Sequence, residues 1–254
     1  MFRPVDFSHL SKFNSDTSAK LIDMIENQAK ADIQEESARP KSRTFAPSSL
    51  RCRRKSWFRI RGSQPDSLPN PDLTLDFTAK LGTYIHTLIQ EKLSKALVED
   101  WIPVKQYLAE NPIPYTYSIK ESGYETQICI ENPPLKFACD GIIRLNGKLY
   151  LLEIKTSEYS SWDSLVEAKP HHMDQIKAYS TILNIPNVLT LYVDRQYGGL
   201  KSFEYAISIG EMNEILNIFE YVSDCAEKNL APERLPESDY MCRNCEYSKK
   251  CREW

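Results

Sequence analysis

The clearest hydrophobic pattern in the chain is a pair of apolar runs on either side of Asn146-Gly147, within the segment FACDGIIRLNGKLYLLEIK of residues 137–155. An Asn-Gly pair between two such runs predicts a β-hairpin with a two-residue turn. Counting outward from the turn places Asp140 opposite Glu153. The second run is apolar on both faces, which predicts a covered central strand.

Apolar residues recur at helical or strand spacing over most of the remaining chain. Helices are predicted over residues 16–36, 75–100, 170–184 and 211–229. Strands are predicted near residues 124–131, 136–145, 148–156, 188–194 and 201–208. The order helix, three strands, helix, strand predicts an α/β sandwich with a mixed sheet. We expect the first helix to pack its apolar side against the protein, the alternative being that it docks a partner.

The predicted hairpin brings two acids together. Like charges directly opposite each other on one sheet face are destabilising, and burying an unpaired carboxylate costs several kcal/mol. A divalent cation between Asp140 and Glu153 is the simplest compensation. Lys155 falls on the same face as Glu153 and is a candidate to orient water or stabilise developing negative charge. The alternative is a hairpin with solvated acids and Lys155 as a surface counter-ion.

Charge is distributed unevenly along the 254 residues, whose net charge is −3. Residues 39–61 carry nine Lys or Arg and no acid, which leaves about −12 for the remainder. A local basic stretch on an acidic protein indicates a polyanion partner, such as a nucleic acid. The expected nucleic-acid contacts are Arg51, Arg53, Arg54, Lys55 and Trp57, the last by stacking on bases. The alternative is a solvated basic loop.

Membrane and motor functions find no support in the sequence. No apolar run approaches about 18 residues and no secretory signal is present, so we expect a soluble cytoplasmic protein without a membrane partner. No GxxxxGK[ST] phosphate loop is present, so a nucleotide-driven motor would have to be another protein.

Three of the seven cysteines lie close together near the end of the chain, in CRNCEYSKKC. Cys242, Cys245 and Cys251 lack one ligand for a closed four-thiolate site, and Cys52 in the basic stretch is the best fourth. Zinc and a [4Fe–4S] cluster both accept four thiolates, and the alternative is a set of unconnected surface thiols. The remaining three are predicted to be buried small hydrophobes: Cys129, Cys139 and Cys225.

Asp140 followed by Glu153-x-Lys155 on the next strand resembles the PD-(D/E)xK nuclease superfamily. Gly82-x3-His86 and Gln175-x3-Tyr179 are similar to motifs of its RecB-like branch. The four cysteines resemble those of the iron-sulfur exonucleases in that branch, which include CRISPR-adaptation nucleases and phage recombination exonucleases. The resemblance begins near residue 47. It departs from the pattern in two ways: Cys139 stands where a proline usually precedes the first Asp, and no third acidic ligand is evident, Glu125 being the candidate.

The resemblance implies a restriction-endonuclease-like αβββαβ core. Residues 1–46 would form an N-terminal extension with an amphipathic helix, and residues 47–254 a RecB-like nuclease domain. Its cluster lobe would be formed by the Cys52 region and residues 240–254. The cysteines would hold a structural [4Fe–4S] cluster, with zinc as the alternative.

The implied activity is a Mg²⁺- or Mn²⁺-dependent DNA exonuclease acting on single strands or duplex ends in a bacterial, archaeal or phage-infected cell. The metal ligands would be His86, Asp140, Glu153 and the backbone carbonyl of Ile154, with Lys155 positioning the attacking water. Gln175 and Tyr179 would orient Lys155 or the phosphate backbone. The alternatives are a non-catalytic zinc-containing nucleic-acid-binding protein and a subunit active only within a recombination or CRISPR-adaptation assembly.

Overall fold

The computed structural model describes residues 16–39, 42–66, 73–243 and 245–254. The chain divides into two compact units, residues 1–40 with 67–80 and residues 41–66 with 81–254. None of the described helices is long and apolar enough to cross a membrane.

The first unit contains the helix α1 (Asp16–Ala38), which confirms the predicted N-terminal helix. Its apolar stripe, however, stays largely open to solvent: Leu21 is 59 % exposed and Ile22 51 %. Ala29 is the buried residue of this helix. That this stripe packs against the rest of the protein stays a prediction.

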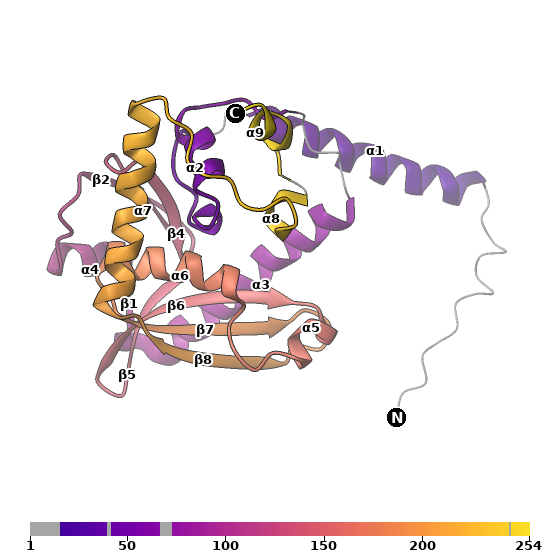
Figure 1. Cartoon of the computed structure of the whole chain (residues 1–254). Helices are drawn as coiled ribbons and strands as arrows, with labels where there is room; N and C mark the ends of the chain where they lie inside the picture. The colour runs from indigo at the N-terminus through magenta and orange to yellow at the C-terminus, as the bar shows by residue number, and fades with distance from the viewer. Residues whose placement is uncertain (1–15, 40–41, 67–72, 244) are drawn as a thin grey trace. The chain divides into compact units, whose positions relative to one another are not determined.

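The second unit contains a five-stranded mixed sheet in the order β1-β5-β6-β7-β8 (Figure 1). Only β6 and β7 run parallel, and the other neighbours are antiparallel. The strands are β1 (Trp101–Ile102), β5 (Gly141–Leu145), β6 (Lys148–Ser157), β7 (Asn187–Asp194) and β8 (Leu200–Ala206). This arrangement confirms the predicted mixed α/β fold.

Two long helices flank the sheet on opposite faces, α3 (Leu73–Leu97) and α6 (Pro170–Leu183). Leu152 and Ile154 of β6 belong to an apolar cluster with Ile85 and Ile89 of α3, whereas Leu151 packs in the cluster that contains Ile176 of α6. Successive residues of a strand point to opposite faces, so each helix covers one face. The series α3, β1, β5, β6, α6, β7 is the restriction-endonuclease-like core, as predicted.

A second, antiparallel sheet corrects the assignment of the first core strand. It contains β2 (Tyr117–Ser122), β3 (Glu125–Ile130) and β4 (Leu135–Cys139). The predicted strand near 124–131 is β3 and belongs to this sheet, so the first core strand is the two-residue β1. A strand that short has no period to detect in a sequence.

The predicted strand 136–145 is likewise two strands, because the chain passes from one sheet to the other at Asp140. Gly141 makes the crossing possible: a Cβ atom there would lie 2.8 Å from the ring of Trp101. The register of the β5–β6 hairpin is the predicted one, with Leu145 opposite Lys148, and pairing ends at Gly141 opposite Leu152. Asn146 and Gly147 have φ of +51° and +76°, as a type I′ turn requires.

The remaining elements surround this framework. α7 (Ile209–Glu227) is the predicted last long helix and begins with a capping box formed by Ser208 and Glu211. The shorter helices are η2 (Pro47–Ser49), α2 (Arg53–Ile60), η3 (Val98–Asp100), α4 (Val104–Glu110), α5 (Tyr159–Asp163), α8 (Tyr240–Arg243) and α9 (Ser248–Glu253).

Candidate active site

Asp140 lies at the junction of the two sheets, and its surroundings hold it in place. Its Oδ2 accepts a hydrogen bond from the backbone N–H of Ile154 at 2.7 Å, and its Oδ1 is 3.3 Å from Nδ1 of His86. Its backbone carbonyl accepts from Nε2 of Gln90 at 2.8 Å. The side chain thus faces β6 from the end of β4, close to where the predicted register would have placed it.

Glu153, Lys155 and Gln175 form one hydrogen-bonded group between β6 and α6. Nζ of Lys155 is 2.5 Å from Oε1 of Glu153 and 3.1 Å from Oε1 of Gln175. Nε2 of Gln175 donates to the same Glu153 oxygen at 3.0 Å and to the hydroxyl of Tyr179 at 2.7 Å. The structure therefore brings together the four residues that the sequence motifs singled out on this face.

Burial controls the charge of Glu153, which is 2 % exposed. Burial, and then the charge of Asp140, raises the pKa of Glu153 from 4.5 to about 7, against the opposing effect of Lys155. Its second oxygen, Oε2, is buried without a hydrogen-bond partner. Burial also lowers the pKa of His86, but the hydrogen bond and charge of Asp140 outweigh it and raise that pKa above its usual value.

The donor set suits a hard divalent cation, which prefers oxygen ligands and accepts imidazole. Ligand atoms of His86, Glu125 and Asp140 lie within 4.8 Å of one another. Gly82 lies one turn before His86 on α3, and a Cβ atom there would come within 3.3 Å of Thr156 Oγ1 on β6. Glycine therefore lets α3 approach β6 closely at the position next to His86. The second oxygen of Glu153, which is buried without a hydrogen-bond partner, is a further possible ligand for such a cation.

The structure corrects the expected role of Trp57 and Arg54. Trp57 is 1 % exposed and donates from Nε1 to the carbonyl of Cys225 at 3.2 Å, so it cannot stack on bases. Arg54 is 8 % exposed and donates to the carbonyls of Pro232 at 2.6 Å and Cys251 at 3.1 Å. Both side chains are internal because α2 packs between α7 and the C-terminal tail.

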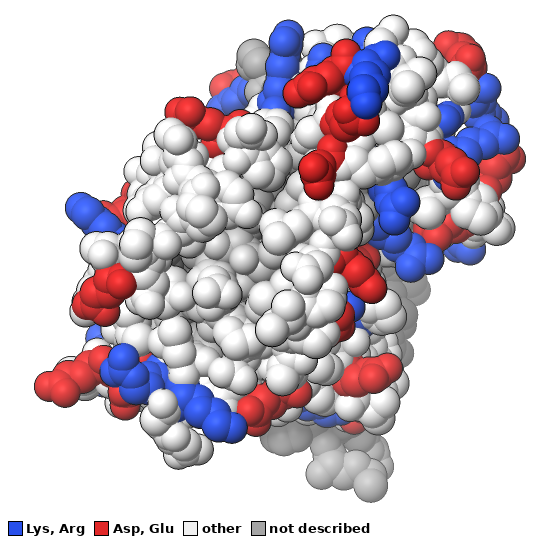
Figure 2. Space-filling view, turned by 60° about the vertical axis from the view of Figure 1, so that its left-hand side comes forward, with Lys and Arg blue, Asp and Glu red and all other residues white. Residues whose placement is uncertain are grey.

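Of the other three expected nucleic-acid contacts, Arg51 and Arg53 are exposed and Lys55 is half-buried. Arg51 pairs with Asp239 at 3.0 Å, and Lys55 is 4.0 Å from Glu246. Arg53 is exposed, and its guanidinium lies 5.7 Å from the centre of the Tyr221 ring. On the face that Figure 2 shows, Lys and Arg alternate with Asp and Glu along the margin of a largely uncharged surface.

Two basic side chains that the sequence analysis did not single out line a second cavity, and the described residues around this cavity include no acid. Arg59 of α2 and Lys136 of β4 line this cavity of about 350 Å³. Nε of Arg59 is buried without a hydrogen-bond partner. Tyr179 lines the same cavity, which places it directly beside the Glu153 group.

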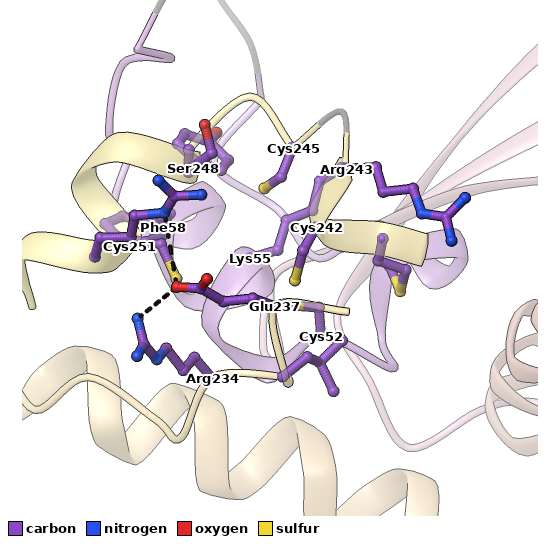
Figure 3. Close-up of a pocket in the computed structure, with 14 residues that line it drawn as sticks. Cys52, Lys55, Phe58, Arg234, Glu237, Cys242, Arg243, Cys245, Ser248 and Cys251 are labelled. Atoms are coloured by element: carbon purple, nitrogen blue, oxygen red, sulfur yellow. Dashed lines mark ion pairs between the residues drawn. The ribbon is translucent and has the colours of Figure 1, made fainter. Parts of the chain in front are cut away.

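The four cysteines proposed as ligands line a single cavity of about 160 Å³ (Figure 3). Burial raises the pKa of the Cys52 thiol, and the other three thiols raise it further. Within the described residues, no three of the four sulfur atoms lie within 4.8 Å of one another. Asp66 accepts from the backbone N–H of Lys249 at 2.6 Å, which ties the segment after α2 to the cysteine-bearing tail.

The other cysteines lie elsewhere, as predicted. Cys139 and Cys225 are buried and Cys129 is half-buried.

No protein-family model and no curated protein matches this chain. Similar solved structures include the crystal structure of SSO0001, with a TM-score of 0.48, 18 % identity, and coverage of 91 % of this chain and 97 % of that one. They also include an alkaline exonuclease (LHK-Exo) from Laribacter hongkongensis, with a TM-score of 0.44, 13 % identity, and coverage of 77 % and 93 %. LHK-Exo in complex with dAMP gives a TM-score of 0.43 at the same identity and coverage. Scores this low do not assign a function.

Proposed function

We propose that this protein is a divalent-metal-dependent DNA exonuclease that hydrolyses phosphodiesters of single strands or duplex ends. One observation carries the proposal: Asp140 and Glu153 are both buried, and Lys155 and Gln175 are bonded directly to Glu153. Burying this much charge costs several kcal/mol. A protein that used these residues only for stability would be better served by apolar side chains.

The metal ligands would be His86, Asp140, Glu153 and the backbone carbonyl of Ile154, and the ion would be Mg²⁺ or Mn²⁺. When bound, such an ion lowers the pKa of a water and neutralises phosphate charge. Lys155 holds its ammonium beside Glu153, where it would position the attacking water and stabilise the charge that develops on the phosphate. Gln175 fixes Lys155 through its amide oxygen and is itself fixed by Tyr179.

The four cysteines would hold a structural [4Fe–4S] cluster. All four cysteines line one cavity, which supports a shared inorganic group there, with zinc as the alternative to the cluster. Arg54 and Asp66 already join residues 51–66 to the tail, and the cluster would add a clamp between the same two segments, so its loss should affect folding before chemistry.

The substrate would be gripped through phosphates. Arg59 and Lys136 reach an acid-free cavity that shares Tyr179 with the catalytic group, which supports phosphate contact at this position. Contacts to phosphate carry no sequence information. We therefore expect low sequence specificity and an affinity that falls steeply with salt.

The test is an anaerobic purification with a visible spectrum and metal analysis, followed by a Mg²⁺/Mn²⁺ nuclease assay on end-labelled linear and on circular DNA. Asp140→Ala and Lys155→Ala should lower cleavage at least about a thousandfold and leave DNA affinity within about threefold, since they remove transition-state interactions. Lys148→Ala, an exposed change on the same strand, is the matched control and should cleave normally.

Each alternative has its own signature in that experiment. Undiminished cleavage by both variants in a clean preparation would refute the assignment of the site. A colourless zinc-containing protein without nuclease activity would identify a nucleic-acid-binding protein. Weak activity that rises with a recombination or adaptation partner would identify a subunit of a larger assembly.

A further inference from the structure

An exposed aromatic cluster lies beyond the end of β6, the strand that carries the candidate catalytic residues. β6 and β7 run parallel and end side by side at Ser157 and Asp194. α5 begins two residues after β6, and the turn between β7 and β8 follows Asp194, so both segments lie at the same edge of the sheet (Figure 1). Tyr159 belongs to the first segment and Tyr197 to the second, and their rings meet edge to face with centres 5.1 Å apart.

One ring anchors this cluster and the two tyrosines stay open. Trp162 of α5 is half-buried, donates from Nε1 to the carbonyl of Tyr192 at 3.2 Å, and lies so close to Gly199 that a Cβ atom there would be 2.7 Å from its ring. Tyr159 lies against Trp162 with ring centres 6.2 Å apart but is 41 % exposed, and Tyr197 is 70 % exposed. Single exposed aromatic residues are ordinary, but adjacent exposed rings indicate a binding surface.

Basic groups connect the candidate catalytic group with this cluster. Nζ of Lys169 donates to Oγ of Ser161 on α5 at 2.7 Å, which places this ammonium beside the aromatic rings. Burial lowers the pKa of His171 at the start of α6, and the charges of Lys169 and Lys155 lower it further, so these three basic groups lie near one another. The chain thus offers positive charge from Lys155 to α5, which suits the backbone of a nucleic acid.

The cluster is within reach of a DNA strand held at the candidate active site. Tyr159 is four positions after Lys155, and at about 3.3 Å per residue of strand this span is at most about 13 Å. Neighbouring nucleotides of a stacked strand are about 3.4 Å apart, so the cluster would meet a base about four nucleotides from the scissile phosphate. Neighbouring base pairs cover the faces of a paired base, whereas an unpaired base can lie on an aromatic ring.

We infer that Tyr159 and Tyr197 form a stacking platform for unpaired bases of the DNA strand that the active site holds. The inference rests on the proposed function and deepens it, because it selects single strands over paired duplex ends as the substrate class. It also assigns to these two residues the stacking role that the sequence analysis expected of Trp57, whose ring is buried. Aromatic rings combined with basic groups along the backbone are a general means of binding single strands without sequence preference.

The experiment measures DNA binding apart from cleavage, by fluorescence anisotropy on the whole chain, purified anaerobically and without added divalent ions. The probes are single strands of about 4 to 16 nucleotides and a blunt duplex of the longest length. Tyr159→Ala and Tyr197→Ala should each weaken binding of the longest single strand about 5- to 150-fold, the range for a lost base–aromatic stack. Binding of the duplex, and of strands of about four nucleotides that end before the platform, should stay within about threefold.

Matched variants separate stacking from structure and from charge. Tyr159→Phe and Tyr197→Phe keep the ring and should bind the longest single strand within about twofold of the wild type. Tyr124→Ala, the same truncation at an exposed tyrosine in the turn between β2 and β3, should bind as the wild type does. The salt dependence of binding should be the same for the alanine variants and the wild type, since no phosphate contact is removed.

The outcomes are distinguishable from failure of the proposed function. If the wild type cleaves DNA but both alanine variants bind the longest single strand as tightly as it does, the inference is overturned while the nuclease proposal stands. The same conclusion follows if those variants lose as much affinity for the blunt duplex, or if the phenylalanine variants bind as weakly as the alanine variants. A wild type that binds single strands through the two rings but cleaves no DNA would support the platform and refute the nuclease proposal.

Discussion

Arg54 offers the sharpest test of the distinction between a residue that contacts DNA and one that holds the protein together. The basic stretch in which Arg54 lies predicts a phosphate contact. In the structure the side chain is buried, and its guanidinium donates to two carbonyls on the C-terminal tail, those of Pro232 and Cys251. Cys251 is one of the four cavity thiols. Arg54→Ala should therefore loosen the tail and with it the inorganic group that we propose the four thiols hold.

The size of the effect follows from the bonds lost. Hydrogen bonds to charged groups contribute roughly 1.5–3 kcal/mol each, so removing two should cost about 3–6 kcal/mol. At roughly 2–4 °C for each kcal/mol in a domain of this size, the midpoint of thermal unfolding should fall by about 10 °C. That loss is a large share of a typical folding free energy of about 5–15 kcal/mol.

The assay compares Arg54→Ala with Arg53→Ala, whose side chain is exposed over the ring of Tyr221. Both proteins are purified anaerobically, and iron per chain, zinc per chain and the unfolding midpoint are measured. Arg54→Ala should lose most of its metal and stability, and Arg53→Ala should keep both. DNA affinity as a function of salt is then measured below the unfolding midpoint.

One result would refute this reasoning. If Arg54→Ala keeps its metal content and midpoint but binds DNA more weakly, with a salt slope reduced by about one, Arg54 is a phosphate contact. The burial and the two carbonyl bonds would then not describe the residue's role.

Two further predictions concern the catalytic face. Tyr179→Phe removes the hydroxyl that fixes Gln175, so kcat on single-stranded DNA should fall about 2- to 13-fold, as expected for a lost hydrogen bond of about 0.5–1.5 kcal/mol, with KM nearly unchanged. An unchanged kcat would show that the hydroxyl does not position the site. Burial lowers the pKa of His172 to about 3, so the unfolded chain binds the proton more readily than the folded chain. The free energy that the neutral, buried imidazole contributes to folding is therefore fully present above about pH 6.5 and is lost as the pH falls towards 3. The thermal midpoint of the wild type should therefore fall more between pH 7 and pH 5 than that of His172→Gln, and parallel pH profiles would contradict this assignment.

Local sequence determined the long helices and the closest pairs. The Asn146-Gly147 turn selects the hairpin register through two positive φ angles, so the pairing next to the turn could be predicted without tertiary information. The i, i+4 spacing of Gln175 and Tyr179 on α6 likewise determined that they meet. The long helices were predictable because apolar periodicity over many residues is a strong signal.

The tertiary structure decided which side chains are internal. A basic stretch has the same composition whether its residues face solvent or a neighbouring helix, and packing of α2 against α7 and the tail buries Trp57 and Arg54 while Arg53 stays exposed. Arg59 and Lys136, 77 positions apart in the sequence, line one cavity only because the fold brings α2 and β4 to it.

The division of strands between two sheets was also beyond local reasoning. The apolar run of residues 136–145 reads as one strand, and it is broken at Asp140 by a hydrogen bond from Ile154 and by the ring of Trp101, both distant in sequence. Glu125 joins the candidate site by the same break. Short-range patterns determine which segments pair with their neighbours in the chain. His86 and Asp140, by contrast, are 54 positions apart in the sequence, and only the folded chain brings them together with Glu125.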